Sequence, residues 1–401
     1  MRVLFADKLP DQARTRLASA GFEVLAEPAL AGDSLTARLA EVTPDVLVVR
    51  STKVTAAHVA ASRSLSLVVR AGAGVNSIDL DACSGAGVFV ANCPGKNAVA
   101  VAELTFALLL AIDRHVVDGA VDLRAGRWNK AAYSKAEGLK GRTLGLLGFG
   151  GIGRAVARRA RAFGMPVIAW SRSLTDEEAA EAGVQRAASP EDVARQCDVL
   201  SVHLALTPET RGLVGESVFT SLRHGSVVLN TSRAAVLDEA ALLSALDQRD
   251  LRAGLDVFSG EPSAKVGAFE HPLGAHPSVV GSHHIGASTT QAQQAVGDEV
   301  CRIVEGFRDQ GQVGNCVNML LRSSADQRVV VRHRDRVGVL AGILALLRED
   351  AINVQEMENL VFPGGAAIAR IQVTGSPSPD LCARLASVEH VLHASVAPIQ
   401  E

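Results

Sequence analysis

The sequence predicts an α/β protein with two doubly wound parallel sheets, followed by a small domain of β-α-β-β-α-β order. Three observations predict this fold. Short aliphatic strands alternate with helices over residues 1–95, and a glycine-rich turn at 148–153 joins a strand to a helix. A polar linker at Leu321–Asp326 then separates these blocks from the remainder of the chain.

In the first block, the aliphatic run Asp45–Val49 is unbroken, as in a strand that helices cover on both faces. Strand, helix and strand recur at this rhythm and predict a parallel, flavodoxin-like sheet. The expected strands are Val3–Ala6, Gly21–Leu25, Asp45–Val49, Leu67–Val69 and Val88–Ala91, with helices at Asp11–Ala20 and near Ser34–Ala40.

The second block begins with a long apolar helix, Val99–Asp113, and its strand count is that of a Rossmann dinucleotide-binding domain. Six strands are expected: Leu144–Leu147, Val167–Trp170, Val199–Val202, Val227–Asn230, Gly254–Val257 and Val279–Gly281. A helix over Thr289–Arg308 is expected to cross back to the first block. The expected domains are therefore 1–97 completed by about 287–320, then 98–286, then 328–401.

The last block predicts a ferredoxin-like unit. Its expected elements are strand Val329–Arg332, helix Gly338–Arg348, strands Asn353–Leu360 and Ala366–Val373, helix Pro379–Ala386 and strand Val391–Ala397. So short a module has a thin core and exposed edge strands, which favours pairing with another copy and predicts a homo-oligomer, a dimer or tetramer.

Composition excludes several classes of protein. The 401 residues are 48% hydrophobic and 21% charged with a formal net charge of −3, which gives no reason to expect nucleic acid or an anionic membrane as partner. The six cysteines show no metal-type spacing, so we expect reduced thiols and no metal site. The N-terminus lacks the apolar region of a signal peptide, and we expect a cytoplasmic protein.

The chain is organised around Gly148-Phe149-Gly150-Gly151-Ile152-Gly153, which follows an aliphatic strand and opens a helix. Glycines in this pattern allow a tight turn, close approach to a pyrophosphate, and contact between helix and strand. The helix N-terminus offers free N–H groups to phosphates. This context predicts dinucleotide binding.

The next strand ends in Ser171-Arg172-Ser173, where an acid usually binds the ribose 2′-hydroxyl. An arginine between serines is suited to a 2′-phosphate, which points toward NADP. Alternatively, Arg172 is a solvated loop residue. The residues alone leave both interpretations open.

Three side chains after strands of the second block suit hydride-transfer chemistry. His284 titrates near neutrality and can exchange the hydroxyl proton. Glu261 can hold the second ring nitrogen, and Arg233 can bind a substrate carboxylate with two hydrogen bonds. His283 and His203 are the rival histidines.

Several motifs in order resemble the D-2-hydroxyacid dehydrogenase family over about residues 1–320. They are Arg70–Asp79, Val101–Leu104, the glycine fingerprint, Asn230–Arg233, Asp256–Pro262 and His284–Ser288. The tail His333–Leu340 resembles an ACT domain, an amino-acid-sensing module. The resemblance implies an NAD-dependent enzyme with Arg233, Glu261 and His284 as catalytic residues, and a phosphorylated hydroxyacid as substrate.

Matched residue by residue, the resemblance also implies the binding sites. Cofactor contacts fall on Gly148, Gly150, Gly151, Ile152, Gly153, Ser171, Arg172, Leu204, Thr231 and Asp256, the last near the nicotinamide amide. Substrate contacts fall on Arg50, Ser51, Arg70, Gly72, Ala73 and Gly74. The cations Arg50 and Lys53 suit a phosphate, although Lys53 is equally explained as a solvated residue and Arg70 as a brace of its domain.

Effector contacts fall on His333, Asp335 and Asn353, with L-serine or another amino acid as ligand. Asp335 stands where asparagine is common in serine-regulated relatives, so the module alternatively serves only to dimerise. Two other functions stay open. One is a dehydrogenase of unphosphorylated 2-hydroxyacids, and the other is a nucleotide-sensing, corepressor-like scaffold that reuses this fold.

Overall fold

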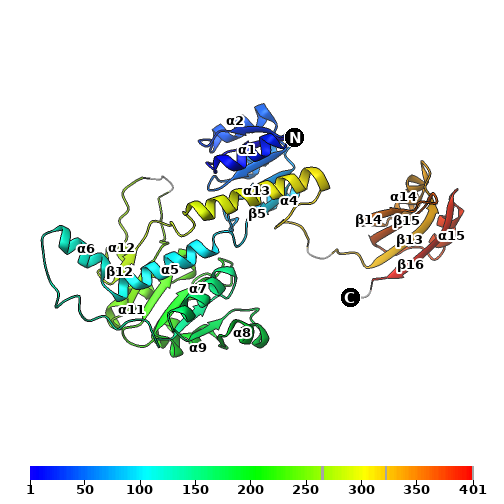
Figure 1. The fold of residues 1–401 in the computed structure, drawn as a ribbon. Helices are drawn as coiled ribbons and strands as arrows, with labels where there is room; N and C mark the ends of the chain where they lie inside the picture. Colours follow the sequence, from blue (N-terminus) through cyan, green and yellow to red (C-terminus); the bar gives the residue numbers. More distant parts are fainter. Residues whose placement is uncertain (263–265, 321–322, 400–401) are drawn as a thin grey trace. The chain divides into compact units, whose positions relative to one another are not determined.

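The structure is a computed structural model that describes residues 1–262, 266–320 and 323–399. It divides into two compact units, Met1–Asn318 and Met319–Glu401. Figure 1 shows both units, coloured from blue at the N-terminus to red at the C-terminus. Leu321 and Arg322 of the expected linker lie outside the described residues.

The first sheet has the strand order β2-β1-β3-β4-β5, with every neighbouring pair parallel. This is the order of a flavodoxin-like sheet, as expected. Its strands are β1 (Arg2–Phe5), β2 (Glu23–Ala26), β3 (Val46–Val49), β4 (Leu67–Arg70) and β5 (Phe89–Asn92). Its connecting helices are α1 (Asp11–Ser19), α2 (Asp33–Val42), α3 (Ala56–Ala61) and α4 (Leu80–Gly85).

All four residues of β3 are fully buried, which confirms the inference drawn from their aliphatic run. Val46 and Val48 pack into one hydrophobic core, while Leu47 and Val49 pack into another. Alternate side chains of a strand point to opposite faces, so the sheet is covered on both sides.

The second sheet has the order β12-β11-β10-β9-β6-β7-β8, again parallel throughout. Its strands are β6 (Leu144–Leu147), β7 (Val167–Trp170), β8 (Gln185–Arg186), β9 (Val199–Val202), β10 (Val227–Asn230), β11 (Arg252–Leu255) and β12 (Val279–Gly281). The prediction of six strands missed β8, because two residues give no periodicity to read.

The helices around this sheet include α5 (Ala98–Asp113), α7 (Gly151–Ala162), α8 (Asp176–Ala182), α9 (Pro190–Gln196), α10 (Glu216–Ser221), α11 (Glu239–Gln248) and α12 (Pro272–Ala275). A short 3₁₀ helix spans Ala234–Val236. The helix α6 (Val116–Arg124) buries none of its residues. The strand expected over Gly254–Val257 ends instead at Leu255, which places Asp256 beyond the strand.

The long helix α13 (Thr290–Gln310) returns to the first sheet, where it lies against α1 (Figure 1). Val300, Ile303 and Val304 share a hydrophobic core with residues of β1. The chain then runs beside β5, where the Val317 N–H donates to Val90 O at 2.8 Å. The helix α13 and the segment around Val317, although distant in sequence, thus pack around the first sheet.

The second unit is an antiparallel sheet of order β14-β15-β13-β16. Its elements are β13 (Gln327–Arg334), α14 (Val339–Glu349), β14 (Asn353–Val361), β15 (Ala366–Thr374), α15 (Leu381–Ser387) and β16 (Val391–Pro398). The order is that of the expected β-α-β-β-α-β unit. Val331 and Ile371 of the sheet share a core with Ile343 of α14 and Leu385 of α15.

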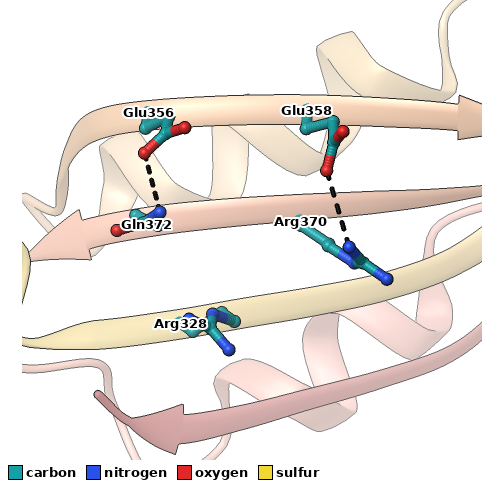
Figure 2. Close-up of a pocket in the computed structure, with 5 residues that line it drawn as sticks. All are labelled: Arg328, Glu356, Glu358, Arg370 and Gln372. Atoms are coloured by element: carbon teal, nitrogen blue, oxygen red, sulfur yellow. Dashed lines mark hydrogen bonds and ion pairs between the residues drawn. The ribbon is translucent and has the colours of Figure 1, made fainter. Parts of the chain in front are cut away.

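The other face of this sheet is polar. A hollow of about 210 Å³ on it is lined by Arg328, Glu356, Glu358, Arg370 and Gln372, and Figure 2 shows these side chains on neighbouring strands. The acids already have partners: Gln372 donates to Glu356 at 2.7 Å, and Arg370 lies 3.6 Å from Glu358. These interactions across neighbouring strands are typical of a solvated sheet face.

The six cysteines are free, and four of them are buried. Burial raises the pKa of the Cys93 and Cys197 thiols to about 12, so both behave as small core side chains. In the described part of the chain, no three His, Cys, Asp or Glu residues are grouped to hold a metal ion. Among the same residues, no helix is long and apolar enough to cross a membrane.

Candidate active site

The glycine turn between β6 and α7 is closely packed on one side and open on the other. A Cβ on Gly148 would lie 2.5 Å from His203 O, and one on Gly153 would lie 2.3 Å from Gly148 O. Gly150, by contrast, faces open space and caps α7 with no side-chain hydrogen bond. Gly151 and Ile152 follow as the first helical residues, so free N–H groups face the opening, and the turn fits a pyrophosphate.

The loop after β7 departs from the usual ribose-binding pattern. Ser171 and Arg172 follow β7, and Arg172 Nη1 lies 3.8 Å from Glu209 Oε2 on the loop after β9. Leu204 starts that loop and packs against the core. Thr231, after β10, is buried with its hydroxyl 3.1 Å from the Thr105 hydroxyl.

His284 and Glu261 are brought together, as the sequence predicted. His284 Nδ1 lies 2.7 Å from Glu261 Oε2, although 23 residues separate them in the chain. The other Glu261 oxygen accepts the Phe258 N–H at 2.9 Å. Among the described residues, His284 Nε2 has no hydrogen-bond partner, and the side chain is 49% exposed. One ring nitrogen is therefore held and the other is available. The rival His283 is exposed.

This contact changes the titration of both groups. The hydrogen bond from Glu261 raises the pKa of His284 above its usual value and outweighs the burial that would lower it. Burial alone would raise the pKa of Glu261, but the bonds from His284 and the Phe258 N–H bring it below the usual value. The arrangement favours the ion pair and makes His284 a stronger base.

Asp256 holds the loop that carries His284. Its buried carboxylate accepts from the Ser282 hydroxyl at 2.7 Å and from the N–H groups of Ile285 and Gly286 at 2.8 Å each. These bonds fix a loop in which His284 has a φ of 53°. Sequence reasoning missed this role. The expected contact of Asp256 with a nicotinamide amide stays a prediction.

Arg233 follows β10 and points toward the first sheet's loop 71–74. Its Nη1 donates to Ser232 O at 2.7 Å. A Cβ on Gly74 would lie 2.6 Å from Arg233 Nη2, so a larger residue there would displace the guanidinium from its present position. A Cβ on Gly72 would likewise lie 1.6 Å from Arg70 Nη1. Ala73 O accepts from Asn92 at 2.6 Å.

Asp7, at the end of β1, fixes the Arg50–Thr52 backbone and was missed by sequence reasoning. Its Oδ2 accepts the N–H groups of Arg50 at 2.7 Å and Thr52 at 2.9 Å, and its Oδ1 accepts the Ser51 hydroxyl at 3.0 Å. Burial would raise the pKa of Asp7, but these backbone bonds outweigh it and lower the pKa. An acid directly after a parallel strand was the available signal.

Arg50, Arg70 and Arg233 form a cationic cluster, whose charge is partly offset by Asp7 near Arg70 and by Glu261 near Arg233. Burial lowers the pKa of Arg70, and the charges of Arg233 and Arg50 lower it further. The Nε of Arg70 is shielded and has no hydrogen-bond partner among the described residues. Within that same part of the chain, none of the three arginines lies within 4.0 Å of a carboxylate. Such a cluster suits an anionic ligand.

In the second unit, the expected effector residues differ in exposure. His333 is only 1% exposed; its Nδ1 lies 2.8 Å from Arg334 O and its Nε2 lies 3.1 Å from Asn359 Oδ1. Asp335 and Asn353 are exposed. Both nitrogens of His333 are thus engaged within its own domain.

The chain resembles known proteins over these two sheets. Residues 106–286 match the family model of the D-isomer specific 2-hydroxyacid dehydrogenase NAD binding domain. The chain is 37% identical over 301 residues to D-3-phosphoglycerate dehydrogenase of Rattus norvegicus, covering 75% of this chain and 55% of that protein. The Bacillus subtilis enzyme is also 37% identical, over 322 residues, covering 79% of this chain and 59% of that protein. The chain thus spans 55–59% of the length of these curated relatives.

The fold is shared with solved structures. The TT0316 protein of Thermus thermophilus matches with a TM-score of 0.70 and 33% identity, covering 79% of this chain and 100% of that one. The match spans a complete solved chain, and the family model covers the glycine turn, Arg233, Glu261 and His284. The chain belongs to the D-isomer specific 2-hydroxyacid dehydrogenase family and contains its NAD-binding domain.

Proposed function

We propose that the protein is a D-3-phosphoglycerate dehydrogenase, which oxidises D-3-phosphoglycerate to 3-phosphohydroxypyruvate with NAD, the first step of L-serine biosynthesis. The observation that carries this proposal is the cluster of Arg50, Arg70 and Arg233, none of which forms an ion pair within 4.0 Å among the described residues. A substrate with both a carboxylate and a phosphate suits a site with three guanidinium groups. The resemblance to two phosphoglycerate dehydrogenases supports the same substrate.

In this proposal each residue has a separate task. Arg233 and the backbone of loop 71–74 hold the substrate carboxylate. His284 Nε2 accepts the proton of the C2 hydroxyl as the C2–H bond breaks, and Glu261 stabilises the imidazolium that forms. NAD, bound at the glycine turn, supplies the hydride acceptor. Arg50 and Arg70 hold the phosphate.

The domain boundaries and partners are also part of the proposal. Residues 1–97 with about 287–320 form the substrate domain, 98–286 the NAD domain and 328–401 an ACT domain that binds an amino acid such as L-serine. A homo-oligomer is supported by α6, which exposes Val117, Val121 and Leu123, and by Trp128, which is 81% exposed. The cytoplasmic location stays a prediction.

The test is a comparison of initial rates with phosphohydroxypyruvate, hydroxypyruvate, glyoxylate and 2-oxoglutarate, using NADH. We expect kcat/KM to favour the phosphorylated acid by about 100-fold, near 2.7 kcal/mol. Arg50→Gln should remove most of this preference, whereas Arg63→Gln, an exposed arginine outside the cluster, should not. Equal rates with unphosphorylated acids would contradict the substrate assignment.

The second candidate is a hydroxypyruvate or glyoxylate reductase, favoured by Ser171-Arg172 in place of the usual acid. Initial rates with the same four oxoacids, measured with NADPH in place of NADH, separate it from the first candidate. A corepressor-like scaffold is a third function, and turnover of any hydroxyacid that His284→Ala abolishes, with NAD binding intact, would exclude it.

A further inference from the structure

The NAD-binding domain lacks an acid where the ribose is usually recognised. Ser171 is the first residue after β7, and Arg172 is the second. An acid in this place normally accepts a hydrogen bond from the ribose 2′-hydroxyl and repels a 2′-phosphate. Arg172 alone would have the opposite effect and attract the phosphate of NADP.

A carboxylate reaches this place from another loop. Glu209 lies on the loop after β9, and in the sheet β9 and β7 are the two neighbours of β6, which leads into the glycine turn. The 3.8 Å contact between Arg172 Nη1 and Glu209 Oε2 therefore joins the loops after β7 and β9, which follow the two strands beside β6.

The loop that carries Glu209 is well fixed. The buried Thr210 hydroxyl donates to Ala205 O at 2.6 Å and accepts the Thr207 N–H at 2.8 Å. A hydrogen bond from the Thr207 hydroxyl lowers the pKa of Glu209, which keeps it ionised. Of the acids in the first turn of α8, Glu178 lies 3.4 Å from Arg154 and Asp176 lies 3.4 Å from Arg186.

We propose that Glu209 replaces the missing acid and selects NAD over NADP, by pairing with Arg172 and by repelling a 2′-phosphate. This inference rests on dinucleotide binding at the glycine turn. It follows that the Ser171-Arg172 sequence does not by itself make the chain NADP-dependent. Without the Glu209 charge, Arg172 is free to bind the 2′-phosphate.

The experiment measures binding by calorimetry and needs no turnover. The ligands are NAD⁺, NADP⁺, 5′-AMP and adenosine 2′,5′-bisphosphate, the last two differing only in the 2′-phosphate. The variants are Glu209→Gln, Arg172→Gln and the double variant. Glu181→Gln, an exposed acid with no ion pair among the described residues, is the matched control for the change in net charge.

We expect the wild type to bind NAD⁺ more tightly than NADP⁺. Glu209→Gln should tighten NADP⁺ and the bisphosphate about five- to tenfold, where tenfold is about 1.4 kcal/mol, and change NAD⁺ less than about twofold. In the Arg172→Gln background, Glu209→Gln should increase the affinity for NADP⁺ by a smaller factor. Glu181→Gln should change neither the ratio of NAD⁺ to NADP⁺ affinity nor the ratio of 5′-AMP to bisphosphate affinity.

Two results would overturn the inference. One is a Glu209→Gln variant whose ratio of NAD⁺ to NADP⁺ affinity stays within about twofold of the wild type. The other is a wild type that prefers NADP⁺. A wild type that binds neither dinucleotide would instead refute the proposed function, and the inference with it.

Discussion

Two glutamates of the first unit each bind a cationic partner, yet only one lies at the candidate active site. Glu261 contacts His284 at 2.7 Å. Glu299 of α13 contacts Lys96 at 3.1 Å and Asn315 at 2.6 Å, and it also pairs with Arg302. The bonds to Arg302, Lys96 and Asn315 lower the pKa of Glu299 to about 2.

A large pKa shift does not by itself identify a catalytic group. Glu299 is only 6% exposed, and both its oxygens are occupied by partners that join α13 to the segments around Lys96 and Asn315. Among the described residues, His284 Nε2 instead has no hydrogen-bond partner, and the side chain is 49% exposed. An unused donor or acceptor that faces solvent distinguishes the candidate catalytic pair His284–Glu261 from the architectural pairs of Glu299.

The largest effect should come from His284→Ala. We expect kcat/KM to fall about 10³-fold because the hydroxyl proton loses its acceptor, while the affinity for NAD⁺ stays unchanged. Steady-state rates and calorimetry measure the two quantities. His283→Ala is the matched control, and an equal loss in that variant would reject the assignment of the base.

Glu261→Gln should have the next largest effect and shift the pH profile. Glu261 raises the pKa of His284, so its removal lowers that pKa. Oxidation requires neutral imidazole, so the acid limb of kcat/KM should move to lower pH. Reduction requires imidazolium, so its basic limb should also move to lower pH. A profile that falls in height without moving would show that Glu261 only positions the ring.

Glu299→Gln should lower stability and leave catalysis alone. We expect the free energy of unfolding to fall by about 2 kcal/mol at pH 7, with kcat/KM within about twofold. The folded-state pKa of about 2 lies below the usual 4.5, so this stabilisation is present above pH 4.5 and is lost as the pH falls toward 2. Urea unfolding across this range measures it, and a difference that persists at pH 2 would contradict the assignment.

Periodicity predicted most of the strands and both parallel sheets, because buried strands appear in the sequence as short aliphatic runs. The strand β8 has only two residues, which is too short to show such a run. His284 and Glu261, the candidate catalytic pair, were predicted through motifs of the resemblance, and the structure brings the two side chains together across 23 residues. Asp7, Glu209 and Glu299 were missed for a different reason. Their partners are set by which strands and helices become neighbours; Asp7 and Arg50, for example, are 43 residues apart.

The smallest effect should come from Lys96→Met, which tests how much of the stabilisation by Glu299 comes from its contact with Lys96. The Lys96 side chain is 38% exposed, so solvent screens its pair with Glu299, and we expect a loss of only about 0.5 kcal/mol. In a double-mutant cycle with Glu299→Gln, the coupling should stay below the single effect of Glu299→Gln, because Arg302 and Asn315 still hold the carboxylate. A coupling that accounts for the whole Glu299→Gln effect would make Lys96 the main partner and leave Arg302 and Asn315 little to contribute.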